Sequence, residues 1–279
     1  MRFFDRMSNG WKLGMTSLKI ISENKQLLVF PIMSSVALIV VVFSFMGGAF
    51  ALWGMNFDIM LEEATGGSEL LLYGFLFIFY LINYFVIVFF NIALIHCTRL
   101  IFDGKPATIS DGLNFSGSRL GTIISWAFLS ATVGVVLQML EDRLGWIGKI
   151  VIGFIGAAWS IATFFVVPII AYEEVSPLEA LKRSGTMMKQ KWGEAIGANF
   201  SFGLFFIVGY LLIIISGIAL FFIHPILGIV SIVLSALLLH TVVSAGKTVF
   251  IAATYNQMHD RPASRFDDNV LDDIFINKK

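Results

Sequence analysis

Residues 173–197 have the sequence EEVSPLEALKRSGTMMKQKWGEAIG, a mixed segment between two long apolar runs. Its start carries signals for a helix N-terminus, because Ser176 can cap a helix, Pro177 suits the first helical position and Glu179 follows the cap by three residues. One side of this helix is apolar and the other is basic: Leu178, Leu181, Met188 and Trp192 on the first, Lys182, Arg183, Lys189 and Lys191 on or beside the second. A basic amphipathic helix of this kind is typical of a membrane interface, where its cations contact anionic lipid headgroups.

The composition agrees with a membrane protein. The chain has 279 residues, of which 57% are hydrophobic and 14% are charged, with a mean hydropathy of +0.85. A soluble domain carries about 25% charged residues, so the surplus apolar surface has to face lipid. The formal net charge is zero, which gives no overall attraction to nucleic acid.

Six apolar runs are long enough to cross a bilayer, which takes about 20 helical residues. They cover residues 27–53, 70–95, 121–140, 147–171, 195–222 and 226–253. The first run follows 26 mixed residues, so we expect a retained helix and not a signal peptide. The sequence therefore predicts an all-α membrane protein with six transmembrane helices in three hairpins and with amphipathic cytoplasmic helices.

Shorter segments surround and connect these runs. An amphipathic segment at 1–26 precedes the transmembrane domain at 27–253, and a polar tail follows at 254–279. Ser110-Asp111 is expected to start a short helix, and Glu141-Asp142-Arg143 is expected to form a tight turn. Pro168 is the one candidate break within a crossing, and it lies close to the end of that crossing.

The basic residues predict the orientation. Sixteen of the 19 lie in segments 1–26, 96–120, 173–197 and 254–279, whereas Arg143 and Lys149 lie on the opposite side and Lys247 lies inside the last crossing. Basic residues are retained in the cytoplasm, so both termini should be cytoplasmic in a multi-pass protein of the cytoplasmic membrane. The single cysteine, Cys97, excludes an intramolecular disulfide.

The segment from Phe164 to Glu194 carries a family resemblance, through Pro168, Ser176, Pro177, Ala180, Leu181, Ser184 and Trp192. It resembles the matching region of uncharacterised six-helix integral membrane proteins of bacteria and archaea. These are similar to the membrane domain attached to some glycerophosphodiester phosphodiesterases. In those enzymes a separate soluble barrel performs the catalysis, and this chain has no room for such a barrel, so the resemblance does not imply hydrolase activity.

Enzymatic motifs are absent from the sequence. It has no glycine-rich phosphate loop, no G-x-S-x-G motif and no histidine pair at zinc spacing. We therefore expect no catalytic residues, no cofactor and no metal site.

Polar residues inside the apolar runs are the remaining signal. Because His240, Ser244 and Lys247 share one helix face, and because intramembrane polar groups often face a protein interior or water, these residues could line a cytoplasmic cavity. The predicted lining is Asn83, Asn91, Asn199, His240, Ser244 and Lys247. Structural explanations stand beside this: His240 could hydrogen-bond a neighbouring helix, Lys247 could extend to the interface, and the asparagines could join helices.

Two classes of function follow. The first is a non-enzymatic membrane protein that binds lipid, through anionic headgroups, or a protein partner, and that acts in membrane organisation or envelope homeostasis. The second is a small-molecule transporter or channel that uses the cavity around His240 and Lys247. An intramembrane enzyme would need a carboxylate at the depth of His240, and the sequence offers none.

Overall fold

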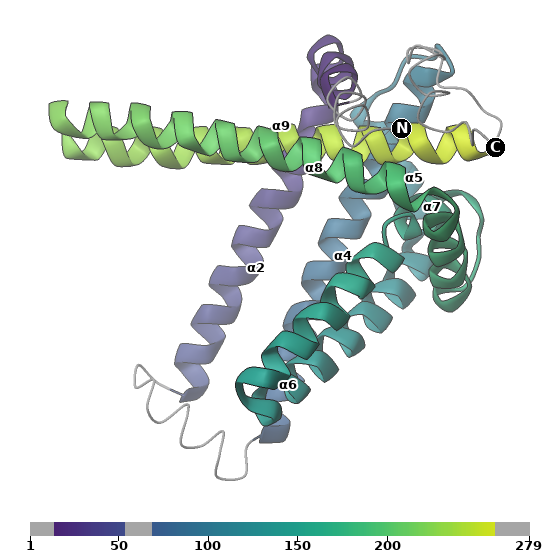
Figure 1. Cartoon of the computed structure of the whole chain (residues 1–279), viewed down its shortest axis with the longest axis horizontal. Helices are drawn as coiled ribbons and strands as arrows, with labels where there is room; N and C mark the ends of the chain where they lie inside the picture. The colour runs from purple at the N-terminus through teal and green to yellow at the C-terminus, as the bar shows by residue number, and fades with distance from the viewer. Residues whose placement is uncertain (1–13, 54–68, 260–279) are drawn as a thin grey trace. The chain divides into compact units, whose positions relative to one another are not determined.

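The computed structural model describes residues 14–53 and 69–259, without the side chains of 52, 53, 69, 70, 147, 190–201 and 257. The described residues are helical apart from short connections and contain no strand (Figure 1). Residues 14–23 form the first described helix. The elements that follow are η1 (Lys25–Leu28), α2 (Val29–Trp53), α4 (Glu69–Phe102), α5 (Ile109–Ser118), α6 (Leu120–Ala162), α7 (Val166–Tyr172), α8 (Pro177–Ile223) and α9 (Pro225–Met258).

Six segments of the described chain are long and apolar enough to cross a membrane. They are Lys25–Ala51, Leu71–Phe102, Leu120–Trp146, Gly148–Tyr172, Phe202–Ile223 and Pro225–Asn256. The predicted all-α class with six apolar helices is therefore confirmed. The apolar side chains of these segments are largely exposed, as a lipid environment requires; Phe222, for example, is 85% exposed.

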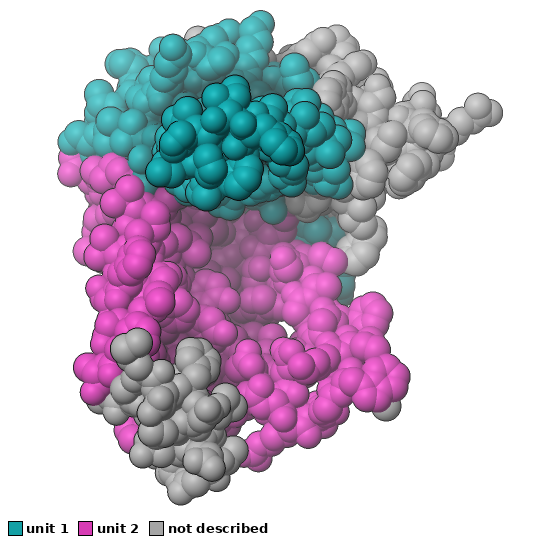
Figure 2. All heavy atoms as spheres, turned by 90° about the vertical axis from the view of Figure 1, so that its left-hand side faces the viewer, with its two compact units in different colours: residues 1–32, 93–112, 186–279 teal, residues 33–92, 113–185 magenta. Residues whose placement is uncertain are grey.

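The chain divides into two compact units (Figure 2). Unit 1 contains residues 1–32, 93–112 and 186–279, and unit 2 contains residues 33–92 and 113–185. Helices α2, α4, α5 and α8 each contribute residues to both units.

In unit 1, α8 and α9 lie side by side as an antiparallel hairpin (Figure 1). Glycines allow the close approach: a Cβ at Gly209 would lie 2.6 Å from the side chain of Leu239, and a Cβ at Gly217 would lie 2.1 Å from that of Ile232. A single residue, His224, connects the two helices.

The described part of the N-terminal amphipathic segment also packs within unit 1. The side chains of Leu18 and Ile21 lie against α9 at Gly246, and a ring carbon of Phe205 lies 3.0 Å from the Cβ position of Gly14. Ile20 and Ile21 are buried. Part of the apolar side of this helix therefore contacts α8 and α9, so it does not face lipid alone.

In unit 2, aromatic side chains join three helices. The rings of Phe45 and Phe75 connect α2 to α4 at 4.9 Å, and those of Phe77 and Phe128 connect α4 to α6 at 5.2 Å. Trp126 and Trp159 stack at 5.9 Å between the two halves of α6. Of these six residues only Trp126 is buried, and Phe128 is 56% exposed, so most of these ring contacts lie near the surface of the unit.

The two halves of α6 meet at Gly145, which has a φ of 62° and a ψ of −158°. Side-chain-bearing residues rarely adopt this conformation. The sequence placed a tight turn at Glu141-Asp142-Arg143, but those residues are helical and the reversal comes at the following glycine. Asp142 instead accepts hydrogen bonds from Tyr73 at 3.3 Å and from Gln138 at 3.0 Å.

A break separates α6 from α7 at residues 163–165. Pro168 explains it, because the proline ring would clash with the carbonyl of Phe164 in a continuous helix. The break thus lies four residues before the proline, and the predicted crossing at 147–171 is divided by it. The buried Ser184 Oγ accepts the Phe165 N–H at 3.0 Å, which satisfies a donor that the break exposes.

Helix α8 differs from the predicted arrangement. The sequence suggested an amphipathic helix followed by a crossing at 195–222, whereas α8 is one continuous helix from Pro177 to Ile223. The segment between contains Gly185, Gly193 and Gly197 but no proline, and isolated glycines do not end a helix. Helix α4 likewise continues past the predicted end at residue 95 to Phe102.

Candidate functional site

The residues predicted to line a polar cavity are divided between the two units. Asn83 and Asn91 on α4 belong to unit 2, and Asn199, His240, Ser244 and Lys247 belong to unit 1. Asn83 Nδ2 donates to the carbonyl of Phe79 at 2.7 Å, a bond within its own helix, and Asn91 is half-buried.

On α9, His240 and Lys247 are exposed and Ser244 is half-buried. The His240 ring lies 6.0 Å from the ring of Phe206 on α8. The side chain of Asn199 lies outside the described residues. A common cavity for these residues stays a prediction.

The start of α8 has the predicted cap. Ser176 Oγ accepts the Glu179 N–H at 3.3 Å, and Pro177 is the first residue of the helix. Within the basic stripe, Lys182 and Lys189 are exposed, and the side chain of Lys191 is not described.

Arg183 is held by carboxylates. Its guanidinium lies 2.5 Å from Glu173 Oε2 and 3.0 Å from Glu179 Oε1. The bond to Glu173, and after it the bond to Glu179, raises the pKa of Arg183. The sequence assigned this arginine to lipid headgroups together with the lysines, although the four-residue spacing from Glu179 already indicated an ion pair within the helix.

A second arginine pairs with the next acidic residue of the same loop. Arg119, which precedes α6, forms an ion pair with Glu174, and its guanidinium lies 5.5 Å from the ring centre of Phe115. Glu174 has a φ of 49°, a conformation that costs a residue with a side chain roughly 1–2 kcal/mol. The loop between α7 and α8 is thus joined by its acidic side chains to the starts of α6 and α8.

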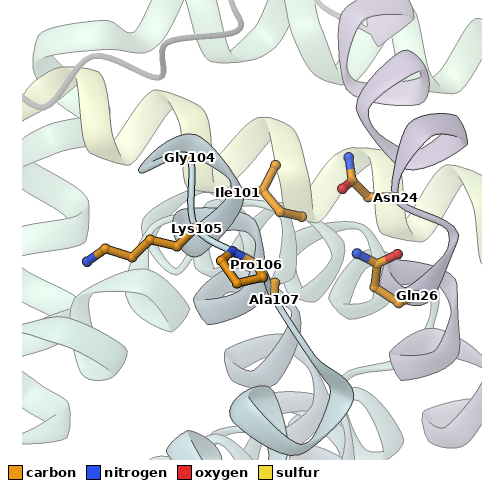
Figure 3. A pocket seen from close by; sticks show the side chains of 7 residues that line it. All are labelled: Asn24, Gln26, Ile101, Gly104, Lys105, Pro106 and Ala107. Atoms are coloured by element: carbon orange, nitrogen blue, oxygen red, sulfur yellow. The ribbon is translucent and has the colours of Figure 1, made fainter.

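A surface pocket of about 340 Å³ lies between the segment before α2 and the loop after α4 (Figure 3). Its lining residues all belong to unit 1: Asn24, Gln26, Ile101, Gly104, Lys105, Pro106 and Ala107. Sequence reasoning did not identify this pocket, because its two walls are far apart in the chain.

Hydrogen bonds fix the loop that forms one wall. The Lys105 N–H donates to the Leu100 carbonyl at 2.8 Å, and the Gly104 N–H donates to the Ile101 carbonyl at 3.1 Å. This pattern is a Schellman motif, in which the residue at the position of Gly104 takes a left-handed conformation; the φ of Gly104 is 71°.

The next helix, α5, begins with a capping box. Asp111 Oδ2 accepts the Thr108 hydroxyl at 2.7 Å and the Thr108 N–H at 2.9 Å, and Thr108 Oγ1 accepts the Asp111 N–H at 3.2 Å. The bond from the Thr108 hydroxyl, then the bond from its N–H, and then the nearby His96 lower the pKa of Asp111. The cap is Thr108, two residues before the predicted start at Ser110.

The first turn of α5 packs tightly within unit 1. A Cβ at Gly112 would lie 2.7 Å from Phe30 Cζ, 2.9 Å from the Ala93 carbonyl and 2.9 Å from Cys97 Sγ. The Cys97 thiol also donates to the Thr108 carbonyl at 3.3 Å. These contacts join α5 to α4 and to the start of α2.

Across residues 14–53 and 69–259, no group of three or more histidine, cysteine, aspartate or glutamate side chains could hold a metal ion. Comparison with protein families matches residues 70–264 to a family of unknown function, DUF6159. The match extends from the second residue of α4 to beyond the end of α9. Comparison with curated proteins finds no match.

Proposed function

The chain belongs to DUF6159, a family of unknown function, and we propose that it is a non-enzymatic multi-pass membrane protein that binds anionic lipid headgroups through lysines of α8. The predicted membership of an uncharacterised membrane-protein family is confirmed by this match and by the six apolar helices. We also propose that the chain is similar to the membrane domain of glycerophosphodiester phosphodiesterases.

The observation that carries the proposal is the exposure of lysine side chains on α8, ahead of the apolar span of the same helix. Lys182 and Lys189 are both exposed. Arg183 is held by Glu173 and Glu179, and we leave it out of the proposed headgroup contacts. These lysines precede the apolar span Phe202–Ile223 in the same helix. Cationic side chains near an anionic membrane surface contribute about 1 kcal/mol each to lipid attraction.

The proposed location is the cytoplasmic membrane, with both termini in the cytoplasm. Its support is the distribution of basic residues, of which segment 173–197 holds four and the region around residues 143–149 holds two. On this orientation the α8 lysines face the leaflet that carries most anionic lipid.

Native mass spectrometry of the full-length protein with added phosphatidylglycerol tests the proposal. The variant Lys182→Gln/Lys189→Gln/Lys191→Gln should retain fewer anionic lipids than the wild type, while Arg183 stays in place to keep its ion pairs. Lys149→Gln is the matched control, because Lys149 is exposed and lies on the predicted opposite side. Equal lipid retention in the triple variant and the wild type would exclude the α8 lysines as the binding element.

The same spectra address the other functions that the sequence left open. A small polar molecule retained by the wild type and lost in His240→Leu would favour transport over lipid binding. A protein without any retained ligand would favour the version of the proposal in which the basic face of α8 binds a protein partner.

A further inference from the structure

We propose that the pocket lined by Asn24, Gln26 and Lys105 binds the phosphate group of an anionic phospholipid. The inference rests on the lipid-binding function proposed above and adds a defined site to it. That site is distinct from the α8 lysines, because none of its lining residues belongs to α8.

The pocket offers hydrogen-bond donors that the described part of the chain leaves unused. The Gln26 carboxamide and the Lys105 ammonium have no hydrogen-bond or ion-pair partner within residues 14–53 and 69–259. Asn24 Nδ2 donates one hydrogen to the Ile20 carbonyl at 2.9 Å, which orients its carboxamide and leaves a second N–H. Two amides and an ammonium suit a phosphate, whose oxygens accept several hydrogen bonds at once.

The two walls hold these donors on different segments. In Figure 3, Asn24 and Gln26 lie on one side of the pocket, and the loop from Gly104 to Ala107 lies on the other. The Lys105 side chain points away from the amides of Asn24 and Gln26. Since lysine has a flexible four-carbon stem and Lys105 is exposed, its ammonium can turn toward a ligand, while the Schellman motif fixes its backbone.

The position of the pocket along the chain indicates a lipid as the source of the phosphate. Lys25, beside Gln26, is the first residue of one apolar span, and Phe102, beside Ile101, is the last residue of another. The ends of membrane spans lie at the depth of lipid headgroups. A volume of about 340 Å³ accommodates a headgroup, and Ile101, Pro106 and Ala107 provide an apolar wall for its glycerol carbons.

Binding of an anion in this pocket should depend on the positive charge of Lys105. Lys105 is the one charged residue among the seven that line the pocket. Removal of the Lys105 charge should therefore weaken binding of an anion strongly, and Lys105→Arg should preserve it.

The test compares the wild type with Gln26→Leu/Lys105→Gln in the full-length protein. Native mass spectrometry with phosphatidylglycerol should show one bound lipid fewer, or about tenfold weaker binding, in the double variant, since hydrogen bonds that involve a charged group are the stronger class. Lys19→Gln is the control, because Lys19 is exposed and does not line the pocket. Thermal unfolding of each variant without lipid establishes that both remain folded.

The phosphate group could come from a lipid headgroup or from a free phosphate ion. Thermal unfolding of the protein with inorganic phosphate alone distinguishes these two ligands. Protection of the wild type by phosphatidylglycerol, and not by millimolar phosphate, supports the lipid. Protection by phosphate alone, lost in the double variant, overturns the lipid as the source. Unchanged lipid binding in the double variant overturns the site, and it leaves the α8 proposal to be decided by its own triple variant.

Discussion

Gly112 shows how one residue without a side chain fixes the position of a whole helix. Three groups from α2 and α4 lie within 3.0 Å of where its Cβ would be, and all three belong to fully buried residues, Phe30, Ala93 and Cys97. A methyl group at this position would have to displace atoms that have no room to move.

We expect Gly112→Ala to destabilise the protein by about 1–3 kcal/mol, the usual cost of overpacking a buried contact. The measurement is thermal unfolding in detergent. Gly117→Ala in the same helix is the matched control, because nothing lies within 4 Å of its Cβ position. Equal melting temperatures of the two variants would contradict the close contact between α5 and α4 at Gly112.

Asp111 should make part of the stability dependent on pH. Hydrogen bonds from the Thr108 hydroxyl and N–H hold the pKa of Asp111 below its ordinary value of 3.8. Since the unfolded chain then binds the proton more readily, the contribution of Asp111 is fully present above pH 3.8 and is lost as the pH falls through the lowered pKa.

Melting temperatures measured from neutral pH to below pH 3.8 test this expectation. The wild type should lose more stability on acidification than Asp111→Asn, whose side chain does not titrate. Asp103→Asn, at an exposed position, should keep the acid sensitivity of the wild type. An Asp111→Asn profile parallel to that of the wild type would rule out the proposed contribution.

At the scale of elements, the apolar composition of the sequence predicted which segments span the membrane, whereas local sequence patterns predicted the ends of the helices less well. The apolar spans were predictable because a length of apolar sequence must match the thickness of a bilayer. Their ends were less predictable: the second apolar run was expected to end at residue 95, yet α4 continues to Phe102. Polar residues at a span end are compatible with helix or loop, and only the Schellman motif at Gly104 ends the helix.

The candidate site was predictable only in part, for a related reason. The spacing of Ser176, Pro177 and Glu179 specified the α8 cap, because capping depends on neighbours in sequence. The partner of Arg119 was not predictable, because Glu174 lies 55 residues away in the chain. The pocket residues Gln26 and Lys105 are separated similarly, and no periodicity of sequence connects them.

Gly145 connects the two halves of α6, and its substitution should lower the stability of this helical hairpin. Its φ of 62° and ψ of −158° are nearly restricted to glycine, and a side chain there costs roughly 1–3 kcal/mol. We expect Gly145→Ala to lower the melting temperature, although no atom lies within 4 Å of its Cβ position. Gly153→Ala, equally uncrowded but helical, should not lower it, and an equal effect of both would contradict a backbone origin.

At the scale of the whole molecule, the orientation in the membrane is open to a direct measurement. In a Cys97→Ala background, single cysteines replace Lys19 and Lys149, both exposed. A membrane-impermeant thiol reagent added to intact cells should label Lys149→Cys, and it should reach Lys19→Cys only after permeabilisation, because basic residues predict that residue 19 is cytoplasmic. The reverse pattern would invert the orientation, and with it the assignment of the α8 lysines to the inner leaflet.

The one-residue connection between α8 and α9 has a consequence for biosynthesis. A span that enters the membrane alone must leave its next loop on the far side, and the segment 54–68 would carry Asp58, Glu62 and Glu63 across in that way. Between Ile223 and Pro225 there is only His224 to translocate. The last two spans should therefore leave the insertion machinery as one preformed hairpin, whose glycine-lined contact can form before either helix meets lipid.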